Sequence, residues 1–585
     1  MISRWATGAA LSAAAITLVA CGGGSDSSTG PGGGTVLPSG AVSLAAGQSA
    51  PLTAANALKI DAGSTGSENV LVLVDTGLTS ISAKANYSVS ATGTGVAGAI
   101  SPPASTVSPS PMAAAASRSP EVTASSEIVW GPKLDVSFGM RLNASSRARF
   151  RGGFDAARAA LRSRRFAPAA ALRSVASAPP QVGDIFTVNV SADPCTNIKT
   201  RGARVVAISQ QAIVLADTLN PTGGFTPADY VRFATRFDTL VYPIDVNNFG
   251  QPSDIDSNGK IILLFTGAVN ELTPANSSSY VGGFFFGRDL FPISDTPQLL
   301  GCAGSNTGEM FYLLAPDPTG QINGNVRRTG FVDSVTTSVI AHEFEHLINA
   351  SRRLYVTPNV QDFEEGWLDE GLAHLAEELL FFKESNLGPR GNIALSAFQN
   401  NTQARNAFNE DMASNAGRYR SYLLKPSENS PFRDDDSLET RGATWNLLRY
   451  LADRKAGASG SDAATWQALV STARVGIDNL SNVFGSDLPG RVRDWNIAHY
   501  TDDLVTGAPA ELTHPSWNFH NIYPGLTGTG QTYPLKVDPL STAGVSGTLI
   551  GGAAAYYRFS IPAGTTANLT LTAPGPVAAR VIRVR

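Results

Sequence analysis

His342-Glu343-Phe344-Glu345-His346, an H-E-x-x-H pattern, is the most informative stretch of the chain. The apolar residues around it recur at helical spacing, which predicts a helix over residues 332–353. Side chains four positions apart on a helix face the same way, so His342 and His346 can bind one metal ion. Glu343 then lies at the edge of the site, beside a water on the metal. The alternative is an ordinary amphipathic helix with two surface histidines, but with only six histidines in 585 residues the pattern rarely arises by chance.

A catalytic zinc site needs a third protein ligand and an open fourth position for water. The next predicted helix, over residues 367–383, offers candidates for this ligand. Glu370, Ala373 and Glu377 share one face of it, and the small Ala373 would let the helix pack close to a metal. We therefore expect the third ligand to come from this helix.

H-E-x-x-H followed about twenty residues later by Glu-Gly-x-Ala resembles the gluzincin group of zinc metallopeptidases. Further stretches are similar to the hyicolysin family of secreted bacterial neutral metallopeptidases. They are Ser253-Asp254-Ile255-Asp256-Ser257-Asn258-Gly259-Lys260, Gly282-Gly283-Phe284-Phe285-Phe286, Gly308-Glu309-Met310-Phe311-Tyr312 and Trp367-Leu368-Asp369-Glu370-Gly371. The resemblance covers residues 182–537 and implies an α+β, gluzincin-like catalytic domain with a zinc-binding active-site helix. It also implies one catalytic zinc ion held by His342, His346 and Glu370, with Glu343 as the catalytic carboxylate.

The resemblance leaves three points open around the zinc site. The alternatives to Glu370 as third ligand are Glu364, Glu365 and Asp369. His374 departs from the family pattern; we expect it, with Glu377, to contact the zinc ligands, and competition for the metal is the alternative. The residue that stabilises the oxyanion is not determined, although helix 441–450 is the first place to look. The candidates for oxyanion stabilisation are Tyr419, Tyr422, Tyr450, Arg441, His499, His514 and His520.

A second metal pattern precedes the strand predicted at residues 261–265. Asp254, Asp256 and Asn258 stand at positions 1, 3 and 5 of what resembles the first half of an EF-hand loop, with Gly259 at position 6. The twelfth position is Phe265 and not the bidentate glutamate of that loop. The pattern predicts a structural Ca²⁺ turn that takes an acid from elsewhere, and a tight Asx-type turn is the alternative.

The N-terminal residues indicate an exported protein. Residues 1–20 have the charged start and apolar stretch of a signal peptide, and Leu18-Val19-Ala20-Cys21 resembles a lipoprotein lipobox, so we expect Cys21 to be lipidated. An ordinary secretory signal is the alternative. The predicted location is the outer membrane or cell surface, or the medium after release, with acyl chains as the membrane contact. In an oxidising compartment Cys195 and Cys302 are expected to form a disulfide, with two free thiols as the alternative.

The composition indicates a folded, multidomain chain. It is 43% hydrophobic and 16% charged with a net charge of −4, which excludes wholesale disorder. Small all-β modules are predicted on both sides of a catalytic block, from β-like patterns at 69–74, 83–91, 555–561 and 568–571. Within the catalytic block, the sequence also predicts a strand at 203–215 and helices at 228–242 and 440–454. The predicted segments are a signal peptide (1–20), a Gly/Ser-rich tether (21–41), a small β domain (42–126), a linker (127–181), a zinc metallopeptidase domain (182–537) and a C-terminal β segment (538–585).

One segment departs from this near-neutral balance. Residues 141–173 hold nine arginines against one aspartate, a local net charge of +8. We interpret it as a solvated linker helix or a cleavable pro-segment, and a nucleic-acid partner is not expected. The sequence thus predicts a zinc endopeptidase acting on proteins or peptides. The alternatives are a catalytically inert surface lipoprotein that uses this scaffold for binding, and a nucleic-acid- or glycan-binding surface protein.

Overall fold

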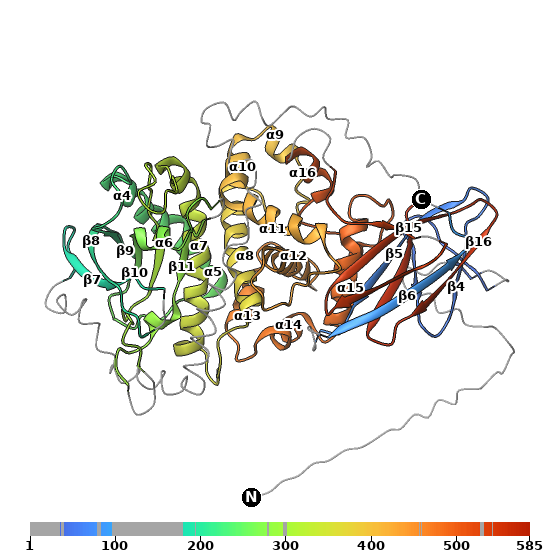
Figure 1. Cartoon of the computed structure of the whole chain (residues 1–585), viewed down its shortest axis with the longest axis horizontal. Coiled ribbons are helices and arrows are strands. Elements are labelled where there is room, and N and C mark those ends of the chain that lie inside the picture. Colours follow the sequence, from blue (N-terminus) through green and yellow to red (C-terminus); the bar gives the residue numbers. More distant parts are fainter. Residues whose placement is uncertain are drawn as a thin grey trace, which may run out of the picture.

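The computed structural model describes residues 35–36, 40–78, 83–95, 179–192, 195–277, 280–295, 301–455, 457, 459–526, 532–540 and 542–585. These residues form a mixed sheet, a block of helices and a β-sandwich in succession (Figure 1), so the expected α+β class is confirmed. The signal peptide, Cys21, the tether up to residue 34 and the Arg-rich segment 141–173 lie outside the described residues. Within the described ranges, no helix has both the length and the apolarity needed to cross a membrane.

The mixed sheet has the strand order β11-β12-β10-β9-β8-β7. Its strands are β7 (Ile185–Asn189), β8 (Thr200–Ile208), β9 (Ala212–Asp217), β10 (Ile261–Thr266), β11 (Gly283–Phe285) and β12 (Met310–Leu314). β10 pairs in parallel with β9 and β12, whereas β11 is an antiparallel edge strand. Apolar clusters cover both faces of this sheet, which explains why β10 is buried along its whole length.

The single strand predicted at residues 203–215 is instead the β8–β9 hairpin. The chain turns at residues 209–211, where the Ser209 hydroxyl and the N–H groups of Gln210 and Gln211 donate to the carboxylate of Asp238. The side chain of a neighbouring helical segment therefore stabilises this turn, which contains neither glycine nor proline.

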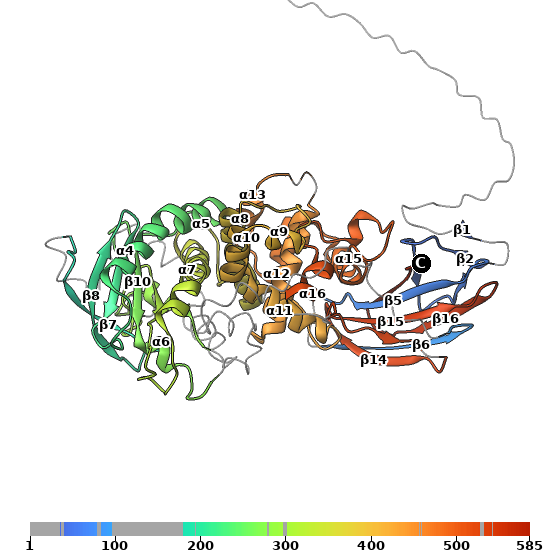
Figure 2. The same cartoon turned by 90° about the horizontal axis from the view of Figure 1, so that it is seen from above.

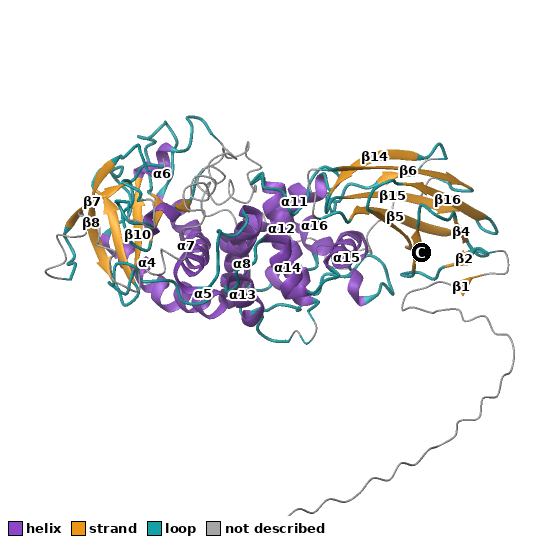
Figure 3. Ribbon diagram, turned by 90° about the horizontal axis from the view of Figure 1, so that it is seen from below, coloured by secondary structure: helices purple, strands orange, loops and turns teal. Residues whose placement is uncertain are grey.

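The first helices, up to η4, alternate with the strands of the mixed sheet along the chain. The block of helices that begins with α7 follows β12 in the chain and lies between the sheet and the sandwich (Figure 3). The helices are α4 (Pro227–Arg236), η3 (Phe237–Val241), α5 (Tyr242–Phe249), α6 (Gly267–Glu271), η4 (Gly287–Leu290), α7 (Thr329–Ser351), η5 (Arg352–Val356), α8 (Gly366–Ser385), α9 (Ser396–Gln399), α10 (Thr402–Ala407), η6 (Phe408–Met412), α11 (Ala413–Leu424), α12 (Leu438–Asp453), α13 (Ala463–Val470), α14 (Gly476–Phe484), α15 (Leu488–Thr501), η7 (Ala510–Leu512) and α16 (Phe519–Leu526). The predicted helices at 228–242, 332–353, 367–383 and 440–454 are confirmed as α4 with η3, α7, α8 and α12.

Two glycines allow the elements around α7 and α8 to pack closely. A Cβ on Gly283 of β11 would lie 2.8 Å from both the Tyr312 carbonyl oxygen and a methyl group of Val339 on α7. A Cβ on Gly371 of α8 would lie 2.5 Å from a methyl group of Thr444 on α12. The absence of these side chains brings α7 against the edge strand and α8 against α12.

The two β segments at opposite ends of the chain form one sandwich and not separate modules, which differs from the prediction. Its sheets have the orders β1-β2-β4-β16-β6-β14 and β13-β15-β5-β17-β3 (Figure 2). The strands are β1 (Thr35–Val36), β2 (Val42–Ser43), β3 (Ser49–Leu52), β4 (Leu58–Asp61), β5 (Ser67–Asp75), β6 (Lys84–Thr92), β13 (Asp538–Pro539), β14 (Val545–Ile550), β15 (Ala554–Ile561), β16 (Thr566–Thr572) and β17 (Val577–Arg583). Central strands of each sheet pair across the two segments, because β5 lies between β15 and β17 and β6 between β14 and β16.

Strand β5 also joins the sandwich to the helices. Leu71 and Leu73 face the sandwich core, whereas Val70, Val72 and Val74 belong to a cluster with Ile497 of α15. The strand is therefore buried on both faces, which accounts for its continuous apolar run. The Tyr556 hydroxyl donates to the Asn496 carbonyl oxygen of α15 at 2.8 Å.

Cys195 and Cys302 form the expected disulfide and link chain positions 107 residues apart. Both cysteines belong to a small apolar cluster with Ile255, which precedes β10, and with Leu354, which follows α7. The disulfide therefore lies close to the C-terminal end of α7. The alternative of two free thiols does not hold in the structure.

We expect His514 to make the fold acid-sensitive. Burial lowers the pKa of His514 to about 3, with Arg454 acting in the same direction, whereas an unfolded histidine titrates near 6.5. The unfolded chain therefore binds the extra proton between these values, and stability falls as the pH decreases from 6.5 toward 3, by up to about 1.4 kcal/mol per pH unit. Thermal unfolding at several pH values should show a smaller acid-induced decrease in His514→Gln than in the wild type. Equal decreases in both proteins would contradict this role.

Candidate metal centre

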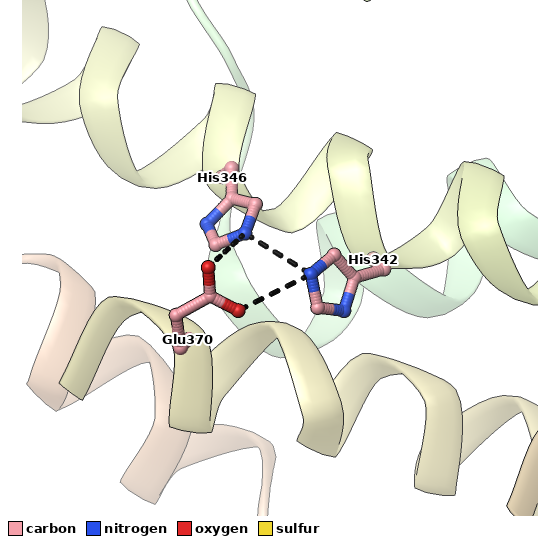
Figure 4. Close-up of side chains that lie close together, drawn as sticks. All are labelled: His342, His346 and Glu370. Carbon is pink, nitrogen blue, oxygen red and sulfur yellow. Dashed lines mark hydrogen bonds and ion pairs between the residues drawn. The ribbon is translucent and has the colours of Figure 1, made fainter. Parts of the chain in front are cut away.

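Helices α7 and α8 bring His342, His346 and Glu370 together (Figure 4). The two Nε2 atoms lie 3.2 Å apart. Glu370 Oε2 is 3.5 Å from Nε2 of His342, and Oε1 is 3.9 Å from Nε2 of His346. All three residues are at most 9% exposed. Two imidazole nitrogens and one carboxylate thus meet around one point, which is the donor set of a catalytic zinc site.

Carboxylates hold the other nitrogen of each imidazole. Nδ1 of His342 lies 2.8 Å from Glu377 Oε1, and Nδ1 of His346 lies 2.9 Å from Asp369 Oδ2. A neutral imidazole that donates from Nδ1 has its lone pair on Nε2. The hydrogen bond with Glu377 therefore favours a lone pair on Nε2 of His342, and the nearby charge of Asp369 favours the same tautomer of His346. The Oε2 atom of Glu370 has no hydrogen-bond partner among the described residues. These three donors therefore fit a metal ion.

The carboxylates around the two imidazoles create an electrostatic potential that favours positive charge at the site. Burial acts to lower the pKa of His342, but Glu370 and Glu377 outweigh burial and raise it to about 9. Burial is likewise outweighed at His346, where Asp369 raises the pKa to about 10. The carboxylates that stabilise a proton on each ring would also stabilise a divalent cation between the rings.

Arg441 of α12 orients the carboxylate of Glu370. Its guanidinium donates to Glu370 Oε1 at 2.9 Å and to Asp436 Oδ1 at 2.5 Å. Burial acts to raise the pKa of Glu370, but Arg441 and the two histidines hold it well below its usual range. The next residue, Gly442, permits the approach of α12 to α11, because a Cβ there would lie 2.2 Å from the nitrogen of Tyr419.

Glu343 lies between α7 and the edge strand β11. Its Oε2 accepts a hydrogen bond from the Phe285 N–H at 2.8 Å. Burial raises the pKa of Glu343, and His342 and His346 partly oppose this shift. A carboxylate with a raised pKa beside two metal ligands is suited to accept a proton and to release it again.

His374 lies behind the three ligands on α8 and is fully buried. Burial, with Arg418 in addition, lowers its pKa to about 3, so the ring is neutral at pH 7. Its Nδ1 lies 3.2 Å from Glu377 Oε1, and its Nε2 lies 3.9 Å from Glu370 Oε2. Glu377 therefore lies between two imidazoles, and Arg418 approaches its other oxygen at 3.5 Å.

The alternatives to Glu370 have other partners. The carboxylate of Glu364 pairs with Arg353 and accepts from the Gly476 N–H at 2.7 Å. Glu365 accepts from the Trp367 indole N–H at 2.6 Å, and Asp369 contacts His346 as described above. The contact of Asp369 with His346 is not visible in the sequence pattern. The contact of Arg418 with Glu377 is not visible either, because nothing in the local pattern connects residue 418 with α8.

Among the oxyanion candidates, Arg441 contacts a ligand of the centre directly. The hydroxyl groups of the three candidate tyrosines have partners elsewhere: Tyr419 contacts His499, Tyr422 donates to Asn496, and Tyr450 donates to the Glu511 carbonyl. The remaining candidates are histidines away from the centre: His514 and His520 both contact His499 of α15.

Replacing Glu377 tests the contact with His342. We expect Glu377→Gln to weaken zinc binding by about 10- to 100-fold, because an amide no longer stabilises the donor tautomer of the His342 imidazole as a carboxylate does. Competition with a chromogenic chelator measures this affinity. Glu384→Gln is the matched control, since Glu384 is on the same helix and pairs with Arg236. Wild-type zinc affinity in Glu377→Gln would show that this contact does not support the site.

No protein-family profile matches the chain. The neutral metalloprotease ShpI of Staphylococcus hyicus is 31% identical to it over 148 residues. The aligned part is 25% of this chain and 30% of ShpI, so the chain spans less than a third of the length of this curated relative. The similarity supports a metalloprotease relationship for part of the chain.

Proposed function

We propose that this protein is a zinc-dependent endopeptidase of the gluzincin type. His342, His346 and Glu370 hold the zinc ion, and Glu343 is the catalytic carboxylate. The observation that carries the proposal is the convergence of three donor groups, two of them imidazoles whose Nδ1 atoms face carboxylates, next to a fourth, proton-accepting residue. The similarity of part of the chain to a neutral metalloprotease is consistent with it.

Each residue has a defined part in peptide hydrolysis. Zinc, when bound, supplies a Lewis acid that lowers the pKa of water and polarises a carbonyl oxygen. Glu343 accepts the proton of the attacking water and delivers it to the amine that leaves. The Phe285 N–H keeps the carboxylate of Glu343 in place, and Arg441 does the same for Glu370.

The position of β11 supports a peptide as the substrate. β11 is an edge strand, and the Phe285 N–H is directed away from β12, toward Glu343. An extended peptide that added to this edge would pass beside the metal centre and could form main-chain hydrogen bonds with the strand. This arrangement favours proteins and peptides over small molecules as substrates. We further propose that the enzyme is exported and anchored through Cys21.

The test combines metal content with proteolysis. The purified chain should contain one zinc ion by elemental analysis and should cleave casein, and a chelator should remove both properties until zinc is restored. The decisive variant is Glu343→Gln. A chain that binds zinc but cleaves no protein substrate would instead favour the inert surface lipoprotein.

A further inference from the structure

Three carboxylates outside the zinc centre lie close together. Asp254 and Asp256 belong to the turn before β10, and Glu309 immediately precedes β12. One oxygen atom of each residue lies within 4.8 Å of the others. Asp254 is exposed, Asp256 is half-buried and Glu309 is buried, so the cluster leads from solvent into the protein.

Glu309 presents an unsatisfied oxygen atom to this cluster. Glu309 is buried, with 1% of its surface exposed. Oε1 accepts hydrogen bonds from the Ser253 hydroxyl at 2.7 Å and from the Ile255 N–H at 2.9 Å. Oε2 is buried and has no hydrogen-bond partner among the described residues. One oxygen thus anchors the carboxylate to the turn, while the other lacks the partner that a buried carboxylate oxygen requires.

No cationic side chain of the described ranges forms an ion pair with these carboxylates. Lys260, the nearest lysine in the chain, donates instead to the carbonyl oxygens of Ser209 and Gln210. Burial, with the neighbouring carboxylates acting in the same direction, raises the pKa of Glu309 to about 8 and that of Asp256 to about 7. A cation bound among them would remove this repulsion.

We propose that Asp254, Asp256 and Glu309 bind a calcium ion. All three donors are carboxylate oxygens, which suit a hard cation, and Asp254 and Asp256 match the first and third positions of an EF-hand loop. An EF-hand loop would have a glutamate at position 265, where this chain has Phe265. Glu309, from another segment, supplies a carboxylate in its place. Asn258 shapes the turn, since its Oδ1 accepts the Lys260 N–H at 2.6 Å.

A bound calcium ion would join three segments next to the catalytic helix. It would tie the turn before β10 to the segment before β12, and the Ser253 N–H of this turn donates to the Ser351 hydroxyl at the end of α7. Ile255 of the same turn packs in the cluster that contains the disulfide. We therefore expect calcium to stabilise this part of the fold without taking part in the zinc chemistry.

The test uses the full chain with Glu343→Gln as background, so that self-cleavage does not contribute. After removal of calcium with EGTA and confirmation that zinc is retained, calorimetric titration should show one calcium ion bound per chain. Calcium should raise the thermal unfolding midpoint by several degrees. Glu309→Gln and Asp256→Asn should each abolish the calcium-dependent shift. Glu511→Gln, which removes an exposed charge elsewhere, should retain it.

A second comparison separates a binding site from a merely structural carboxylate. Without calcium, Glu309→Gln should be at least as stable as its parent, because the amide relieves the repulsion; with calcium it should be less stable. The same calcium shift in Glu309→Gln, no calcium binding by the parent, or an equal shift with magnesium at the same concentration would overturn the proposal. If Glu309→Gln does not fold, the titration of the parent and of Asp256→Asn decides.

Discussion

Glu343→Gln is expected to keep its zinc and to hydrolyse peptides about a hundred- to ten-thousand-fold more slowly than the wild type. Glutamine has the shape of glutamate, and its Oε1 can still accept the Phe285 N–H that now reaches Glu343 Oε2 at 2.8 Å. The amide cannot accept the proton of an attacking water. Geometry and metal are therefore preserved, while the proton acceptor is lost.

Two measurements on the same preparation check this expectation. Elemental analysis gives the zinc content, and the cleavage of casein gives the rate. Glu384→Gln is the control, because it makes the same chemical change where the carboxylate pairs with Arg236. A Glu343→Gln protein that retained both its zinc and its full activity would show that the mechanism assigned to Glu343 is wrong.

Glu370→Ala is expected to lose zinc, and with it activity, more completely than any change at a residue that only positions a ligand. The substitution removes one of three donors and leaves two imidazoles. It also leaves the Arg441 guanidinium facing the site with Asp436 as its remaining partner. The positive charge of Arg441, no longer balanced by Glu370, opposes a divalent cation beside it, so the loss exceeds that of one coordinate bond.

Asp369→Asn is the comparison for Glu370→Ala, because Asp369 acts through Nδ1 of His346. It should weaken zinc binding by about 10- to 100-fold and leave zinc bound at saturating concentration. Zinc bound by Glu370→Ala with wild-type affinity would remove the third-ligand assignment. His374 would then be the next candidate, since its Nε2 lies 3.9 Å from Glu370 Oε2 and has no hydrogen-bond partner among the described residues.

The helices could be predicted from the sequence because their apolar residues recur at a local period. The predicted helix at 332–353 corresponds to α7 (Thr329–Ser351) to within a few residues at either end. The prediction at 203–215 was wrong about the number of strands, because both arms of the hairpin are apolar and no glycine or proline marks the turn.

Separate β modules were predicted because each terminal segment has strand periodicity of its own. Periodicity does not show which strand is the neighbour of which. The structure pairs Val72 with Tyr556 and also with Arg580, across most of the length of the chain. The apolar run of β5 was visible in the sequence, but the two surfaces that bury it were not.

The sequence by itself determined the pair of imidazoles, the neighbouring Glu343 and the calcium-like turn, because their spacing lies within one helix or one loop, where backbone geometry sets the side-chain directions. Only the tertiary structure decided which carboxylate faces which nitrogen. Glu377 reaches His342 and Arg441 reaches Glu370 because helices of different segments pack together. Glu309 meets Asp256 in the same way, because β12 lies beside β10 in one sheet. Such contacts depend on the packing of elements distant along the chain, and no local period encodes them.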